Sequence, residues 1–163
     1  MKLQTIIFTF LLALLSLSTL DASASPSFDD TKSQLLLAAA DNCCAPSVEK
    51  LLKEEVDPNT QNDWGWTPLH FAARNECTET VNILIKYGAD LNMKNEDGIT
   101  PLHLATLSQQ NEVVKTLLKN GANLNMLDND RKTPLNHAVE RGNAEIATIL
   151  EEAAIVNIKP AKR

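Results

Sequence analysis

The three histidines are the first residues in this sequence of 163 residues that could carry out chemistry, because an imidazole binds metal ions and transfers protons near neutral pH. His70 and His103 both follow the tripeptide Thr-Pro-Leu and lie 33 residues apart, so a repeated unit could present them as a pair of metal ligands. Each also stands three residues after a Thr, the spacing at which a side chain bonds back to the residue that caps a helix. Neighbouring helices pack about 8 to 10 Å apart, which is too far for two imidazoles to share one ion. We therefore expect structural histidines and no metal site, and His137 has no evident ligand partner in the sequence.

The cysteines are the second candidates, since a thiolate can act as a nucleophile or form a disulfide. Cys44 and Cys77 are equivalent positions 33 residues apart, and a helix spacing of about 8 to 10 Å exceeds the limit of about 7 Å between the Cα atoms of a disulfide. A bond between the adjacent Cys43 and Cys44 would be strained, and no spacing places a His or Asp base beside any of the three. We expect three free or partly buried thiols, with a redox-labile pair as the first alternative and a nucleophile as the second.

The sequence contains none of the common catalytic motifs: a glycine-rich phosphate loop, HExxH, GxSxG and CxxC are all missing. The 21 acidic residues outnumber the 15 basic ones, for a formal net charge of -6. No basic run of five or more residues occurs, so the chain lacks the clustered Lys and Arg with which proteins bind nucleic acids or anionic membranes. We therefore expect no enzymatic activity, no cofactor and no nucleic-acid partner.

Internal repeats explain why these residues recur at a fixed distance. The segment Thr67–His70 returns as Thr100–His103 and, with Asn in place of His, as Thr133–Asn136, each time 33 residues later. Gly88–Asn92 likewise returns as Gly121–Asn125. A period of this length is typical of a solenoid built from stacked units.

Each unit predicts two short helices. Thr67 suits a helix N-cap and is followed by Pro in the first turn, which predicts a first helix over 68–74. Three apolar residues share one face of a second helix over 79–87, and Gly88 stands where a helix end favours a left-handed residue. The polar stretch 89–99 then crosses to the next unit. Because neither helix is long enough to be stable alone, the units must stack into an α-solenoid.

These motifs resemble the ankyrin repeat, whose signature combines TPLH, GADxN and a 33-residue period. The resemblance covers about 31–158 and implies an all-α ankyrin-repeat solenoid of helix-turn-helix units joined by β-hairpin-like loops. It also implies that the His of each TPLH motif holds its turn by hydrogen bonds. The expected repeats span about 31–61, 62–94, 95–127 and 128–158.

The first and last units depart from the pattern. Leu35 stands at the Pro position of the first unit, and Glu151 replaces an apolar residue in the last. Such changes suit capping repeats, whose outer faces meet water. Arg131 replaces the Gly of the third hairpin, and we expect that hairpin to be distorted.

The N-terminal 24 residues are typical of a signal peptide, with a basic start, a nearly continuous apolar run over 6–15 and a cleavage sequence at Ala22–Ala24. An uncleaved membrane anchor is the alternative, weakened by four Ser and Thr residues in the apolar stretch. We expect a protein that is exported to the periplasm or secreted, with flexible segments at 25–30 and at the basic tail 159–163.

Positions that vary between repeats and point outward are where we expect recognition. The resemblance implies that these are the hairpin tips and the exposed face of each first helix. An exposed Trp is costly unless it is covered, and Trp is frequent among interface hot spots, which selects Trp64 and Trp66. Packing along its own hairpin is an equal alternative for Trp66. The expected partner-binding residues are Trp64, Trp66, Arg74, Asn75, Glu96, Asp97, Ile99, Leu107, Ser108, Asn129, Asp130, Lys132, Glu140 and Arg141.

The sequence thus predicts a monomeric, non-catalytic module that binds a protein partner and, after signal cleavage, no membrane. One alternative is a periplasmic stress or redox accessory protein that uses Cys43, Cys44 or Cys77. Another is a secreted effector directed at a host protein. Titration of the thiols would distinguish the binding module from the redox accessory protein.

Overall fold

The computed structural model of the protein describes residues 28–158, and within this range the chain forms eight α-helices and no β-strand. This all-helical architecture confirms the predicted fold class. The helices are α2 (Phe28–Asp41), α3 (Ala45–Lys53), α4 (Pro68–Arg74), α5 (Thr78–Lys86), α6 (Pro101–Leu107), α7 (Asn111–Lys119), α8 (Pro134–Glu140) and α9 (Ala144–Ile158).

A capping threonine starts the first helix of each of the last three pairs. The Thr67 side chain accepts a hydrogen bond from the backbone N–H of His70, and the His70 ring accepts one from the N–H of Thr67. Pro68 follows in the first turn, where no N–H is needed. The same capping box starts α6 and α8, so all three helices begin at the predicted prolines. Helix α5 begins and ends one residue before the range predicted for it.

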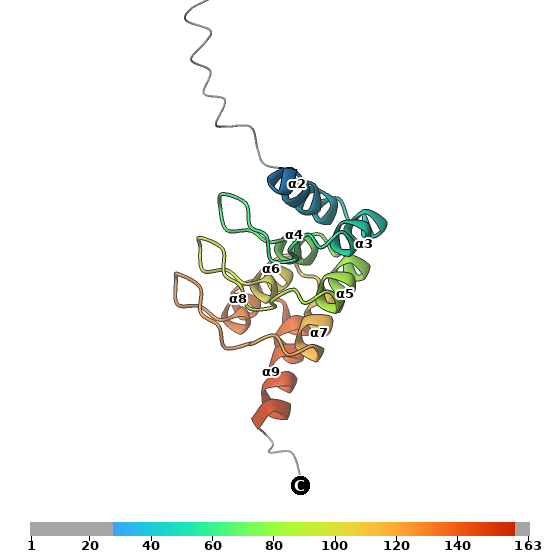
Figure 1. The fold of residues 1–163 in the computed structure, drawn as a ribbon. Helices are drawn as coiled ribbons and strands as arrows, with labels where there is room; N and C mark the ends of the chain where they lie inside the picture. Colours follow the sequence, from blue (N-terminus) through green and yellow to red (C-terminus); the bar gives the residue numbers. More distant parts are fainter. Residues whose placement is uncertain (1–27, 159–163) are drawn as a thin grey trace, which may run out of the picture.

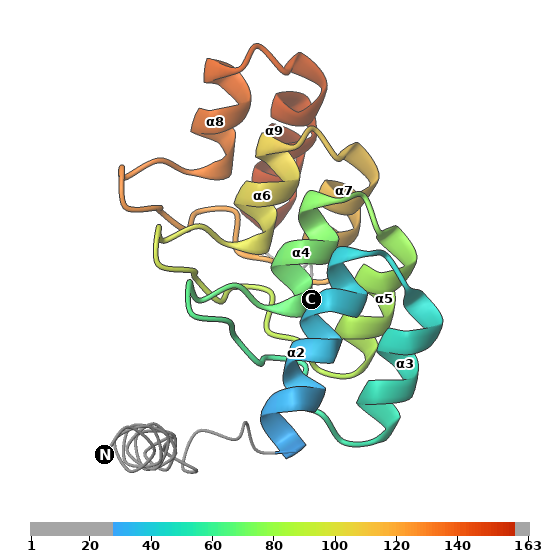
Figure 2. The ribbon, with the colours of Figure 1, turned by 90° about the horizontal axis from the view of Figure 1, so that it is seen from above.

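The helix pairs stack side by side in two rows, as Figures 1 and 2 show. The first helices α2, α4, α6 and α8 contact one another in that order, and α3, α5, α7 and α9 form the second row. The core between the rows is mainly aliphatic, and Leu84, Val113 and Leu117 are fully buried. Because each pair buries its apolar face only against its neighbours, the array is held together by stacking.

Three hairpin-like loops project in a row beside the first helices (Figure 1). Each loop is closed by an Asn or Asp side chain, as where Oδ1 of Asn95 accepts the backbone N–H of Asp97. Neighbouring tips are joined by backbone hydrogen bonds. The N–H of Glu96 donates to the carbonyl oxygen of Trp64 at 3.1 Å, and the N–H of Asn129 donates to that of Asp97 at 3.0 Å.

The third loop keeps the geometry of the other two, so the distortion predicted at Arg131 is wrong. Arg131 has a φ of 61°, close to the 74° and 73° of Gly65 and Gly98. A Cβ at Gly98 would come within 2.6 Å of Oδ1 of Asn129 in the next loop, whereas no further loop follows Arg131 in the described residues. Glycine is required where loops pack together, and at the last loop a side chain meets only the modest cost of left-handed backbone.

Most expectations for the chain ends concern residues outside the described range, namely the signal peptide at 1–24 and the tail at 159–163. At the N-terminal side, α2 already begins at Phe28, so part of the segment 25–30 expected to be flexible is helical. No helix within 28–158 is long and apolar enough to cross a membrane.

Candidate functional site

The loop tips and the first helices share one side of the molecule, where the two tryptophans lie in different environments. Trp64 stands at the tip of the first loop with 65% of its surface exposed. Trp66 is half-buried, with its ring 5.1 Å from the ring of Phe71 and the Arg74 guanidinium 5.1 Å from its centre. Trp66 therefore packs within its own repeat, whereas Trp64 faces solvent.

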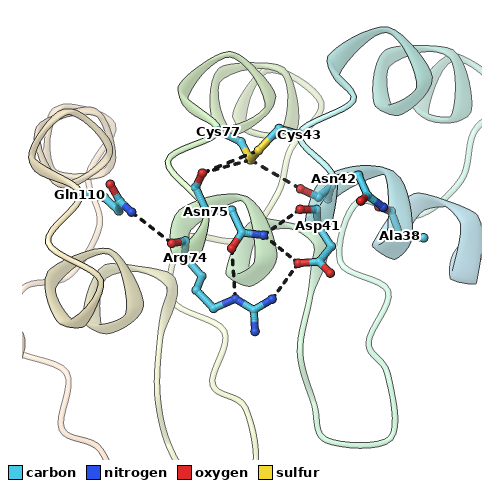
Figure 3. The surroundings of a disulfide bond; sticks show 9 residues. Ala38, Asp41, Asn42, Cys43, Arg74, Asn75, Cys77 and Gln110 are labelled. Carbon is cyan, nitrogen blue, oxygen red and sulfur yellow. Dashed lines mark hydrogen bonds and ion pairs between the residues drawn. A yellow bond between two sulfur atoms is a disulfide. The ribbon is translucent and has the colours of Figure 1, made fainter.

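Arg74 and Asn75 connect the first repeat to the second (Figure 3). Arg74 Nη2 forms an ion pair with Oδ1 of Asp41 at 2.7 Å, and Asn75 Nδ2 donates to both the carbonyl oxygen and Oδ1 of Asp41 at 2.7 Å. Asp41 was not among the predicted residues, although its position 33 residues before Arg74 marks it as the equivalent residue of the first repeat. Two of the expected binding residues are thus held in place by contacts inside the molecule.

The middle of this side carries Ile99, Leu107 and Ser108, all half-buried. Leu107 ends α6 at the position that Arg74 and Glu140 occupy in the neighbouring repeats, and Ser108 caps that helix. An apolar side chain at this point separates two charged ones.

Buried histidines fix the loops to the helices. His70 Nε2 lies 3.0 Å from the carbonyl oxygen of Ile99, and because Nδ1 accepts the N–H of Thr67, the proton is on Nε2. Burial lowers the pKa of His70 to about 4, although its backbone hydrogen bonds oppose this. Burial likewise lowers the pKa of His103, whose Nε2 contacts the carbonyl oxygen of Lys132 at 3.1 Å. Both rings are therefore neutral at physiological pH, and each holds the following loop by a hydrogen bond. This confirms the structural role predicted for them.

The expected binding residues of the last repeat are mostly exposed. Lys132 Nζ forms an ion pair with Oε2 of Glu140 at 2.7 Å. Asn129 Nδ2 donates to a carbonyl oxygen of the preceding loop at 2.8 Å. Asp130 and Arg141 are exposed at the tip of the loop and at the end of α8. Glu96 and Asp97 of the second loop, which stand at the positions of Asn129 and Asp130, are exposed as well.

His137 has a partner that the sequence analysis missed: its Nε2 lies 2.6 Å from Oδ2 of the buried Asp128. Burial raises the pKa of Asp128, but hydrogen bonds from the backbone N–H of Lys132 and from His137 outweigh it and hold that pKa below its usual value. The pair joins α8 to its own loop. Among residues 28–158, no three His, Cys, Asp or Glu side chains come together as metal ligands would.

The expectation of three free thiols is wrong, because Cys43 and Cys77 form a disulfide with their Cα atoms 5.2 Å apart (Figure 3). Cys44 and Cys77 are indeed equivalent, since each caps the second helix of its repeat. Cys43, one residue earlier, has a φ of 55°, and this left-handed turn brings it close to the next repeat. Gly142 occupies the same position of the last repeat and was the sequence signal for that turn.

Cys44 is the free cysteine of the described residues, and it is exposed. Its Sγ lies 3.0 Å from the hydroxyl of Ser47, and hydrogen bonds to Ser47 lower the pKa of the thiol.

Comparison with protein-family models agrees with this architecture. A model described as ankyrin repeats (3 copies) matches residues 35–128 and again residues 109–160. The comparison with curated proteins gave no match. Ankyrin repeats are generally protein–protein interaction modules, and the family is typically non-catalytic. From its stacked helix pairs, capped turns and matched residues, the chain belongs to the ankyrin repeat family.

Proposed function

We propose that this protein binds a protein partner through its loop tips and the adjoining face of its first helices, and that it catalyses no reaction. The exposure of Trp64 is the observation that carries the proposal. A large aromatic ring in solvent is unfavourable unless another molecule covers it, and such rings dominate the energy of many interfaces.

The surroundings of Trp64 support an interface with an apolar centre. Ile99 and Leu107 are half-buried on the next repeat and leave part of their apolar surface in contact with solvent. Trp64, Ile99 and Leu107 form the apolar strip of this proposal. Four exposed carboxylates lie on the neighbouring loops and on α8: Glu96, Asp97, Asp130 and Glu140. An apolar centre with a charged rim is the usual composition of a binding surface. The matching surface of the partner should be apolar with basic edges.

A separate observation supports the compartment that we propose. The disulfide between Cys43 and Cys77 supports export, because disulfides persist in oxidising compartments and are rare in the cytosol. We infer a protein that is exported by its N-terminal segment to the periplasm or beyond the cell. Sequencing the N-terminus of the exported form should give a start at Ser23 or Ser25. A retained Met1 on a cytosolic protein would contradict this proposal.

Thiol chemistry is the second candidate function, and the exposed Cys44 beside Ser47 is the observation in its favour. A thiol-dependent accessory protein should lose its effect when Cys44 is replaced by Ser, whereas a binding module should retain its partner. Titration of the native protein should show one reactive thiol, since two of the three cysteines are paired.

The test of the binding proposal is affinity capture with the immobilised protein from cells that contain its natural partner. A Trp64→Ala, Leu107→Ala double variant should lose at least about nine-tenths of the captured partner, because a hot spot contributes about 2 kcal/mol or more. A Lys119→Ala variant, altered at an exposed position of α7 in the second row of helices, is the matched control and should bind normally. Both variants must first show an unchanged melting temperature. Undiminished capture by the folded double variant would move the binding site elsewhere.

A further inference from the structure

The first repeat leaves uncovered the positions that every later repeat buries. Leu35 of α2 has 54% of its surface exposed, whereas the equivalent Pro68, Pro101 and Pro134 are buried against the preceding repeat. Leu51 of α3 is likewise half-exposed. Its equivalents in the later repeats, all fully buried, are Leu84, Leu117 and Leu150.

These positions form a groove of about 510 Å³ between α2 and α3. Its walls are mainly apolar and include Leu35, Ala39 and Leu51. Its charged lining residues are Lys50 and the ion pair between Lys32 and Glu54. A capping repeat needs a polar outer face, so this end differs from the water-facing cap expected from the sequence. The groove has the position and the chemistry of a surface on which another repeat stacks.

The last repeat has the opposite surface uncovered. Val139 of α8 has 62% of its surface exposed, although the equivalent Ala40, Ala73 and Thr106 are almost completely buried against the following repeat. On α9 the exposed Glu151 occupies the position of Leu52, which is buried in the first repeat. The C-terminal end therefore exposes an apolar side chain on its first helix and the carboxylate of Glu151 on its second, where Ile155 and Val156 are also exposed near the helix end.

The two ends also carry opposite charges on their second helices. In a continued stack, the α3 helix of a second copy would follow α9, because second helices contact second helices throughout the array. This brings the exposed Lys50 of one copy to the same interface as the exposed Glu151 of the other. Two identical ends facing each other would instead place equal charges together, which disfavours a head-to-head pair.

The last loop is also compatible with such a stack. Gly65 and Gly98 each pack closely against the following loop, and Arg131 stands at the same position of the last loop. A second copy stacked on the last repeat would bring no loop against Arg131, because its helix α2 extends back to Phe28 where the later repeats have a loop.

We propose that two copies of this chain associate head to tail, with the first repeat of one stacked on the last repeat of the other. Because the surfaces in contact differ, each added copy leaves a new free end, and short open-ended oligomers form as the concentration rises. This self-association replaces the monomer expected from the sequence.

Single-end variants test the proposal. Leu35→Glu should disable the N-terminal surface and Val139→Glu the C-terminal one, each weakening self-association at least about tenfold, because a carboxylate would be buried without a partner. Sedimentation of each purified variant should show a monomer at a concentration where the unmodified protein forms dimers and larger species. A 1:1 mixture of the two variants should form a dimer that grows no further, because each supplies the surface that the other lacks.

Unchanged melting temperatures keep the comparison valid, and Lys119→Ala, altered at an exposed position of α7 in the middle of the array, should associate like the unmodified protein. A second pair of variants, Lys50→Glu and Glu151→Lys, should associate more strongly when mixed than when alone. A monomer for the unmodified protein from about 1 μM to about 1 mM would overturn the proposal. So would full association of Val139→Glu on its own, because a head-to-head dimer needs only the N-terminal surface.

Discussion

Cys43 and Cys77 bond across two repeats although they occupy different positions of the 33-residue unit. The bond joins the bend between α2 and α3 to the bend between α4 and α5, on the same edge as the ion pair between Arg74 and Asp41 (Figure 3). The first repeat is therefore fastened to the second by a covalent link and by side-chain contacts in addition to helix packing.

Removing this disulfide should destabilise the protein. The bond connects residues 34 apart. Closing a loop of that length lowers the conformational entropy of the unfolded chain and so raises its free energy by about 3 to 4 kcal/mol. Cys43→Ser should lower the free energy of unfolding by this order, measured by urea denaturation, and Cys44→Ser should leave it nearly unchanged because that thiol is unpaired. Peptide mapping that found Cys44 linked to Cys77 would contradict the pairing.

Acid should weaken the fold through the buried histidines. The unfolded chain binds a proton at His70 near the ordinary pKa of 6.5, whereas in the folded protein burial lowers that pKa to about 4. Between these values the unfolded state holds more protons than the folded state. The contribution of the neutral His70 ring to the free energy of unfolding is therefore retained above pH 6.5 and is lost as the pH falls from 6.5 toward 4. From pH 6.5 to pH 5 the loss from His70 alone should be about 2 kcal/mol.

The control for this pH effect uses a residue that the fourth repeat already contains. Asn136 replaces the histidine there and still forms the capping box with Thr133. A His70→Asn, His103→Asn variant should therefore fold, with lower stability at pH 7 because the bonds to the next loops are lost. Urea midpoints at pH 7 and pH 5 should differ much less for it than for the unmodified protein. An equal drop in both proteins would rule out these histidines as the cause.

Much of the fold could be predicted because its signals are local. The capping Thr, the first-turn Pro and the 33-residue period placed α4, α6 and α8 correctly. The disulfide could not be obtained from comparing equivalent positions, because it depends on a left-handed residue that shifts the contact by one position. The pair of Asp128 and His137 was missed for a similar reason: it joins a loop to the helix after it and has no counterpart in the other repeats.

Glycine at position 131 should stabilise the third loop. Arg131 holds a φ of 61° that glycine adopts without strain, so Arg131→Gly should raise the free energy of unfolding by about 1 kcal/mol. Gly98→Ala should have the opposite effect, because the added Cβ would come within 2.8 Å of the backbone nitrogen of Asn129. Thermal unfolding of both variants measures the difference, and a destabilised Arg131→Gly would show that the Arg side chain supports the loop.

Stacking should make the buried leucines far more important than the loop tips. Leu117 is fully buried in α7, and Leu117→Ala should cost about 2 to 5 kcal/mol, enough to unfold much of a short array. Leu102→Ala should behave in the same way. Glu96→Ala, altered at an exposed tip, should change the melting temperature little. Similar effects from both kinds of substitution would contradict the assignment of faces.

The salt dependence of partner binding should reflect the acidic rim around the apolar strip. Replacing Asp97 and Asp130 by Asn should slow association several-fold at low salt and leave dissociation nearly unchanged, because rim charges steer the encounter more than they hold the complex. Surface plasmon resonance with the captured partner measures both rates. A faster dissociation with unchanged association would place these carboxylates inside the contact.

The most direct test of the proposed function is the affinity of the isolated partner for the unmodified protein and for Trp64→Ala, measured by titration calorimetry. Trp64 has 65% of its surface exposed, so the variant should nearly keep its melting temperature. The dissociation constant should rise at least about thirtyfold, as expected for a hot spot of about 2 kcal/mol. An unchanged dissociation constant in a folded Trp64→Ala variant would contradict the proposed function, because the exposed ring would then contribute nothing to binding.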